Sequence, residues 1–147
     1  MKLAWLLWLA SVLPAPTAER LCLATTVYLE ARDQPELGQR AVAEVALRRF
    51  ASKKHGASLC SVVSARKQFA PGIVSPDYRV RQGRAWDRAW EVAGTALAMW
   101  QKPRSQRREV VPGADHFYAH NLVQPTWAQG GEPVTVIGDH AFMRLGL

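Results

Sequence analysis

The apolar residues of the N-terminal third recur at helical spacing. Between Leu21 and Asp33 they return every three or four residues, which predicts a helix with one buried face. This helix ends before Pro35, because the residue preceding a proline is pushed out of helical geometry. Asp33 and Glu36 form a capping-box pattern, which predicts a second helix directly after a tight corner. The apolar face of the second helix comprises Leu37, Ala41, Val42, Val45, Ala46 and Arg49, and its outer face Gln39, Arg40, Glu44 and Arg48.

Tryptophans carry a second strong helical pattern. The helix is predicted by the spacing of Trp86, Trp90, Ala93, Leu97 and Trp100, and we expect these tryptophans in the core rather than on a sugar-binding face. Residues 51–84 read as a loop with a short helix around "SLCSVVSA". Further on, "DHFYAH" and "VTVIGDHAFM" are separated by "QPTWAQGGEP", which predicts a small antiparallel hairpin. Helices followed by strands indicate an α+β domain.

The first eighteen residues have the layout of a secretory signal. A basic start is followed by the apolar run "LAWLLWLASVL" and by the small-residue stretch "PAPTA". We expect cleavage near Ala18, with cleavage after Thr17 or retention as an anchor as the alternatives. At about ten residues the apolar run is short for a membrane span. The sequence therefore predicts a signal peptide or signal anchor over 1–18 and a single domain over 19–147.

Charge and cysteine content agree with an exported protein. The 147-residue chain has a net charge of +7, and loss of 1–18 leaves 18 basic and 12 acidic residues. Such a basic protein suits wall polymers or lipid surfaces outside the cytoplasm better than it suits nucleic acid. In that compartment Cys22 and Cys60 most simply form one disulfide bond; in the cytoplasm they would be small buried residues.

One glutamate and three histidines are the candidates for chemistry. Glu30 lies beside the apolar face of the first helix, where desolvation would raise its pKa toward that of a general acid. The alternative is an exposed glutamate paired with Arg32. Among the histidines, "HFYAH" has zinc-ligand spacing on a helix, with Asp115 or Asp139 as further ligands. On a strand His116 and His120 would lie about 13 Å apart, so we expect hydrogen-bonded histidines lining a cleft, including His140, and no metal.

Four segments resemble, in order, the blocks of the SleB-type cell-wall hydrolases. They are "VYLEARDQPELGQRAVAEVALRRF", "SLCSVVSARKQFAPG", "GADHFYAHNLVQPTWA" and "VIGDHAFMRL". The resemblance covers nearly all of residues 22–145. It implies a lysozyme-like α+β fold, no cofactor, and cleavage of the MurNAc–GlcNAc β-1,4 bond of peptidoglycan by lytic transglycosylation.

The resemblance also assigns roles to residues. The catalytic glutamate of the family's "EAR" motif is Glu30 here; it would protonate the glycosidic oxygen and then take a proton from the C6 hydroxyl of muramic acid. The substrate would be bound by the polar groups of Gln68, His116, Tyr118 and His140, and by Trp127 and Phe69 as sugar-stacking walls. The chain departs from the family where "EARDQ" replaces "EARGE" and "LRR" replaces "LNR". Asp33 and Gln34 stand where the family has glycine and a second glutamate. Catalysis stays possible because Glu30 is present, and Gln34 and Arg48 are the residues expected to alter the cleft or its charge.

Three functions fit the sequence. The first is an exported lytic transglycosylase that acts on peptidoglycan glycan strands. The size and charge of the chain also suit a phage endolysin. The second is a zinc-dependent wall amidase or peptidase that uses the histidines. The third is a non-catalytic basic module that binds the wall or nucleic acid through its charge. For the first function we expect a monomer that makes transient membrane contact through 1–18 and no contact with nucleic acid.

Overall fold

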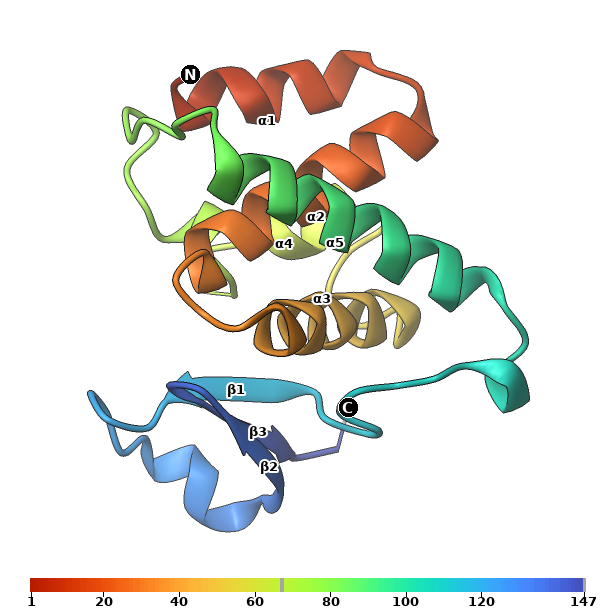
Figure 1. The fold of residues 1–147 in the computed structure, drawn as a ribbon, viewed down its shortest axis with the longest axis vertical. Helices are drawn as coiled ribbons and strands as arrows, with labels where there is room; N and C mark the ends of the chain where they lie inside the picture. The colour runs from red at the N-terminus through yellow and green to blue at the C-terminus, as the bar shows by residue number, and fades with distance from the viewer. Residues whose placement is uncertain (67, 147) are drawn as a thin grey trace.

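The computed structural model describes residues 1–66 and 68–146. A mainly helical part is followed by a small antiparallel sheet at the C-terminal end of the chain (Figure 1), which confirms the predicted α+β class. The helices are α1 (Leu3–Val12), α2 (Ala15–Ala31), α3 (Glu36–Ala51), α4 (Leu59–Ser64) and α5 (Arg84–Gln101), and the short 3-10 turns are η1 (Ala70–Gly72), η2 (Arg104–Gln106) and η3 (Thr126–Gly130).

Helix α2 is the centre of the helical part. All residues from 21 to 28 are buried, so the helix is enclosed on every side and not along a single face. Two of these residues are polar: the hydroxyls of Thr25 and Thr26 donate to the carbonyl oxygens of Leu21 and Cys22, at 2.7 and 2.8 Å. These bonds satisfy the hydroxyls within the helix itself. Glu30 follows in the last turn, where the helix reaches the surface.

The N-terminal segment packs against this helical part. Helix α1 buries Leu3, Leu6 and Ala10, and Lys2 pairs with Arg79 in an isolated β-bridge. The boundary expected near Ala18 falls inside α2, which begins six residues before the start predicted from the apolar spacing. The structure therefore places 1–18 on the fold and not apart from it. None of the helices in residues 1–66 and 68–146 is long and apolar enough to cross a membrane.

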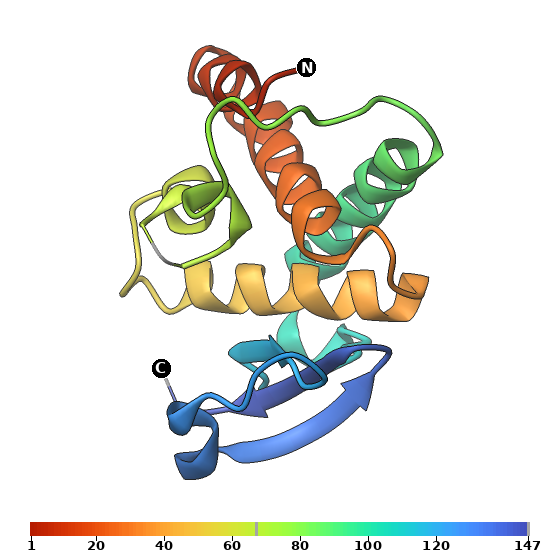
Figure 2. The same cartoon turned by 90° about the vertical axis from the view of Figure 1, so that its left-hand side faces the viewer.

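Helix α3 lies between the helical part and the sheet (Figure 2). It starts after Pro35 without a side-chain cap, so the predicted capping box is wrong; the Asp33 carboxylate instead accepts a hydrogen bond from the Gln34 side chain at 3.2 Å. Gln39 and Glu44, expected in solvent, are buried. The reason is that α3 is covered on two opposite sides, and the prediction allowed for one.

The sheet has the strand order β1-β3-β2, with β1 (His116–Ala119), β2 (Glu132–Ile137) and β3 (His140–Arg144). The expected hairpin forms within "VTVIGDHAFM" itself, where the chain turns at Gly138, and β1 then pairs with β3. Gly138 has a φ of +57°, and a β-carbon there would lie 2.3 Å from the Gln34 side-chain oxygen. Glycine is therefore required for this turn to approach α3 closely.

The tryptophan helix and the cysteines complete the helical part. Helix α5 confirms the predicted tryptophan helix, and its three tryptophans are partly buried against the core. Cys22 of α2 and Cys60 of α4 form a disulfide bond across 38 residues. The bond ties the central helix to the short helix that precedes η1, so it helps to fix the segment that contacts Glu30.

We expect the Cys22→Ala/Cys60→Ala double variant to lose roughly 2–4 kcal/mol of unfolding free energy, because the disulfide restricts the unfolded chain. Chemical denaturation of both proteins measures this difference. A reducing agent should destabilise the wild type and leave the double variant unchanged. Equal sensitivity of the two proteins to the reductant would contradict a stabilising bond.

Candidate active site

A cavity of about 560 Å³ lies between the end of α2, helix α3 and strand β1. It contains nearly all of the residues that the sequence assigned to catalysis and substrate binding, although these come from distant parts of the chain. Its lining comprises Glu30, Arg49, Gln68, Ile73, His116, Phe117, Tyr118, Ala119, Val123, Trp127, His140 and Leu145. Among these lining residues Glu30 is the sole carboxylic acid.

Glu30 is held by one hydrogen bond and is largely removed from water. Its Oε1 accepts from the backbone N–H of Ala70, the first residue of η1, at 2.7 Å. Burial raises the pKa of the Glu30 carboxyl above its ordinary value, and the Ala70 hydrogen bond opposes this rise without cancelling it. A carboxyl with a raised pKa keeps its proton at higher pH, which is the property that a general acid needs.

A chain of three side chains forms another wall of the cavity. Arg49 Nη2 lies 3.0 Å from His116 Nε2, and His116 Nδ1 lies 2.8 Å from Asp115 Oδ1. Because a guanidinium only donates, Nε2 accepts and Nδ1 carries the hydrogen that Asp115 receives. Burial alone would raise the pKa of Asp115, but hydrogen bonds from His116 and from the N–H groups of Leu145 and Gly146 lower it. The imidazole is thus fixed in one tautomer and one orientation.

The remaining polar residues leave atoms unused. Gln68 Oε1, His140 Nδ1 and Arg49 Nε are buried and have no hydrogen-bond partner in the described part of the chain. Burial lowers the pKa of His140, and the nearby Asp33 and Asp139 carboxylates oppose this. Buried polar atoms in proteins are nearly always paired. All three atoms belong to side chains that line the cavity.

Aromatic rings form the outer wall. Trp127 is 41% exposed, and its ring centroid lies 5.3 Å from that of His116 and 5.6 Å from that of Tyr118. Trp127 is therefore partly open to the cavity that it lines. Phe69 differs, since it is 1% exposed, packs against Phe117 and does not line the cavity. Its predicted role as a sugar-stacking wall is corrected: the Phe69 ring lies under Arg49, at 5.1 Å, and supports the guanidinium from the core.

Two residues of the site were missed by the sequence analysis. Arg49 was placed among apolar positions of its helix, and Asp115 was considered only as a metal ligand. A charged residue on an otherwise apolar face was the one signal for Arg49, because such a residue needs a buried partner. This signal did not identify the partner, His116, which lies 67 residues away in sequence.

The three departures from the family pattern lie outside the cavity. Gln34 is buried beneath the β2–β3 turn, where its amide donates to Asp139 Oδ2 and accepts from the Asp139 N–H, both at 2.9 Å. Arg48 does not line the cavity and pairs with Glu109 at 2.8 Å. Asp33 is exposed at the corner. None of the three side chains lines the cavity around Glu30, although the Asp33 carboxylate opposes the lowering of the pKa of His140 by burial.

The histidines do not form a ligand cluster. Within residues 1–66 and 68–146, no group of three or more His, Cys, Asp or Glu side chains is arranged to hold a metal ion. His120 faces away from the cavity and lies 3.2 Å from the Gly138 carbonyl oxygen. The zinc-dependent alternative has no ligand set in this part of the protein.

Residues 33–143 match the family model described as cell wall hydrolase. The chain belongs to the cell wall hydrolase family. This membership confirms the resemblance drawn from the four sequence blocks. The matched segment of this cell wall hydrolase begins at Asp33, just after Glu30, so the role of that glutamate depends on the geometry described above.

Solved structures share the fold of this cell wall hydrolase. The catalytic domain of the germination-specific lytic transglycosylase SleB from Bacillus anthracis is 22% identical, with a TM-score of 0.69 over 86% of this chain and 93% of that chain. The catalytic domain of the Bacillus cereus SleB protein has the same identity and TM-score, over 86% and 89% of the two chains. These similarities confirm the lysozyme-like fold. No curated protein matches the sequence.

The burial of Glu30 predicts a pH-dependent stability difference. A carboxyl whose pKa is raised on folding contributes stability that is present below its unfolded pKa and is lost as pH rises through the folded pKa. We therefore expect Glu30→Gln to be more stable than the wild type near neutral pH, with an advantage that shrinks toward about pH 4. Urea unfolding of both proteins at about pH 4 and about pH 7.5 measures this.

The exposed Glu36 supplies the matched control. Glu36→Gln removes the same charge from an exposed position, so it controls for the loss of one negative charge. A Glu30→Gln difference that is the same at both pH values would contradict a raised pKa.

Proposed function

We propose that this cell wall hydrolase cleaves the MurNAc–GlcNAc β-1,4 bond of peptidoglycan as a lytic transglycosylase, with Glu30 as its single acid and base. The observation that carries the proposal is the isolation of Glu30: it is the one carboxyl among the described lining residues, and it is desolvated with a raised pKa. The solved SleB domain from Bacillus anthracis, which has the same fold, is described as a lytic transglycosylase.

One carboxyl group suffices for both proton transfers of this reaction. Glu30 in its protonated form donates to the glycosidic oxygen, the bond from that oxygen to the muramic acid C1 breaks, and an oxocarbenium-like state forms. The Glu30 carboxylate then accepts the proton of the C6 hydroxyl while that oxygen bonds to C1 and closes a 1,6-anhydro ring. The GlcNAc unit leaves with the glycosidic oxygen and the proton from Glu30, and the C6 oxygen takes its place at C1, so no water is consumed. Glu30 ends as a carboxylic acid, ready for the next strand.

The other lining residues bind and orient the glycan in this proposal. The side chains of Gln68 and His140, which line the cavity, hydrogen-bond sugar hydroxyls or the acetamido groups. Tyr118 and His116 contribute polar edges, and Trp127 covers one face of a sugar ring. Asp115 and Arg49 act through His116, by holding its ring, and are positioning residues.

We expect Glu30→Gln to lower the release of soluble muropeptides from purified peptidoglycan by at least about 100-fold, because the amide cannot transfer the proton. Mass spectrometry of the products made by the wild type should find anhydro-muramic ends. Glu36→Gln, which removes an exposed carboxyl, is the matched control and should retain full activity.

The products decide between reaction types. Hydrated reducing ends would replace the transglycosylase proposal by a lysozyme-like hydrolysis. Loss of activity with a chelator, together with full activity of Glu30→Gln, would support the zinc-dependent amidase. A folded wild-type protein that binds peptidoglycan and releases no product would support the non-catalytic module.

We also propose that the protein is exported as a monomer and contacts the membrane transiently through 1–18. The amino-terminal layout supports export, and Trp5 and Trp8 on α1 are 66% and 64% exposed, as expected of residues that sit at a membrane surface. A phage endolysin would need the same route to the wall. The competing observation is the burial of Leu3 and Leu6 against the fold.

Intact-mass analysis of the protein recovered from the cell envelope or medium tests the export signal. A mass lacking 1–18 is the expected outcome, with a mass lacking 1–17 as a close variant. The full-length mass in a membrane fraction would indicate an uncleaved anchor. Full-length protein confined to the cytoplasm would overturn the proposal of export.

A further inference from the structure

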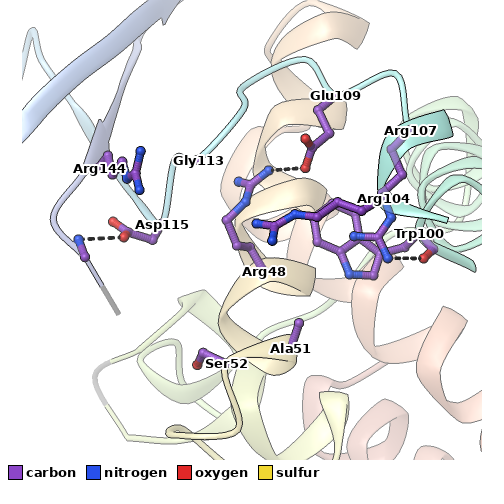
Figure 3. A pocket seen from close by; sticks show the side chains of 11 residues that line it. Arg48, Ala51, Ser52, Trp100, Arg104, Arg107, Glu109, Gly113, Asp115 and Arg144 are labelled. Atoms are coloured by element: carbon purple, nitrogen blue, oxygen red, sulfur yellow. Dashed lines mark hydrogen bonds and ion pairs between the residues drawn. The ribbon is translucent and has the colours of Figure 1, made fainter. Parts of the chain in front are cut away.

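A second cavity, of about 420 Å³, lies on the other side of Asp115 from Glu30. Its walls come from the end of α3, the end of α5, the segment after it and the C-terminal tail (Figure 3). We call it the arginine cavity, and its lining comprises Arg48, Ala51, Ser52, Trp100, Arg104, Arg107, Glu109, Gly113, Asp115, Arg144 and Gly146. Four arginines face two acids across this space.

Both acids are already engaged within the protein. Glu109 accepts from Arg48 at 2.8 Å. Asp115 accepts from His116 and from the backbone N–H groups of Leu145 and Gly146, at 2.8, 2.8 and 2.9 Å. The acids of the arginine cavity are thus used to hold the structure, and they neutralise only part of its positive charge.

Two of the arginines remain available. Arg107 donates to the carbonyl oxygens of Trp100 and Lys102 and lies over the Trp100 ring at 4.4 Å, so its position is fixed. Arg104 and Arg144 are exposed, and their guanidinium groups have no hydrogen bond or ion pair in the described residues. The Arg144 side chain runs past Gly113, where a β-carbon would lie 3.4 Å from Arg144 Cδ. Figure 3 shows the two groups on opposite sides of the cavity.

The arginine cavity and the Glu30 cavity share their dividing wall. At three places in this wall, one of two consecutive residues lines the arginine cavity and the other lines the Glu30 cavity. The pairs, with the residue of the arginine cavity first, are Arg48 and Arg49 on α3, Asp115 and His116 at the start of β1, and Gly146 and Leu145 in the tail. The Asp115–His116 hydrogen bond links the two sides. A polymer bound at Glu30 therefore lies next to a cationic cavity whose own acids are engaged.

We propose that the arginine cavity binds free carboxylates of the stem peptide carried by a muramic acid of the glycan bound at Glu30. This inference rests on the proposed function. The peptide leaves the glycan strand through the lactyl group and bears free carboxylates, and guanidinium groups bind carboxylates in a directional, two-pronged geometry. Arg104 and Arg144 are the residues that contact these carboxylates, one from each side of the cavity, and they make the enzyme selective for peptide-bearing strands.

The test compares two substrates made from one peptidoglycan preparation: strands with intact stem peptides, and the same strands after an amidase has removed the peptides. For the Arg104→Gln/Arg144→Gln variant we expect kcat/KM to fall by about tenfold or more on peptide-bearing strands, mainly through KM. On strands without peptides it should equal the wild type. Arg84→Gln/Arg88→Gln, which removes two exposed arginines of α5, is the matched control and should not change the ratio between substrates.

An equal loss on both substrates would overturn the proposal in favour of general attraction between charges. No loss on either substrate would overturn it as well. Thermal unfolding of each variant checks the fold, and both sites are at the surface, so we expect unchanged midpoints.

A binding measurement separates this proposal from the proposed function. Titration of a soluble stem tetrapeptide should give saturable binding to the wild type that is at least about tenfold weaker in Arg104→Gln/Arg144→Gln. Such binding by a protein that cleaves neither substrate would overturn the proposed function and leave the peptide site standing. Binding of a poly(glycerol phosphate) chain and not of the peptide would overturn the peptide site.

Discussion

The burial of α3 on two opposite sides is the constraint on which the rest of the structure depends. This helix lies between the helical part and the sheet, so its polar side chains lose water and must find partners inside the protein. Glu44 accepts from the Val110 and Val111 N–H groups, Arg48 pairs with Glu109, and Arg49 lies against His116. These contacts fix the path of residues 109–116, and that segment forms walls of both cavities.

Local pattern was sufficient to locate several helices and the corner between two of them. The corner between the first helices, the tryptophan helix and the position of Glu30 before the corner all follow from spacing and from Pro35. The same reasoning failed for α3, because a second covering layer cannot be read from the helix's own sequence. Gln39 and Glu44 have the polarity of exposed residues, and tertiary packing alone decides that they are buried.

The sequence predicted part of the set of residues that form the site, but it did not predict which of these residues contact one another. The family motifs named Glu30, His116 and Trp127 correctly as neighbours in one cavity. They did not separate Phe69 from Trp127, because exposure of an aromatic ring depends on what packs over it. Arg49 was identified as a site residue only from its contact with His116 in the structure. A contact between residues so far apart in the sequence cannot be predicted from the local pattern around either of them.

Gln34 illustrates how a departure from the family pattern can preserve a site. The amide both accepts from the Asp139 N–H and donates to the Asp139 carboxylate, which ties the β2–β3 turn to the corner after Glu30. A glutamate at this position would place a second carboxylate against Asp139, and like charges at such a distance require one of them to take up a proton. Glutamine makes both bonds without a charge. Because His140 begins the strand that follows this turn, the two Gln34 hydrogen bonds help to hold that wall of the cavity in place.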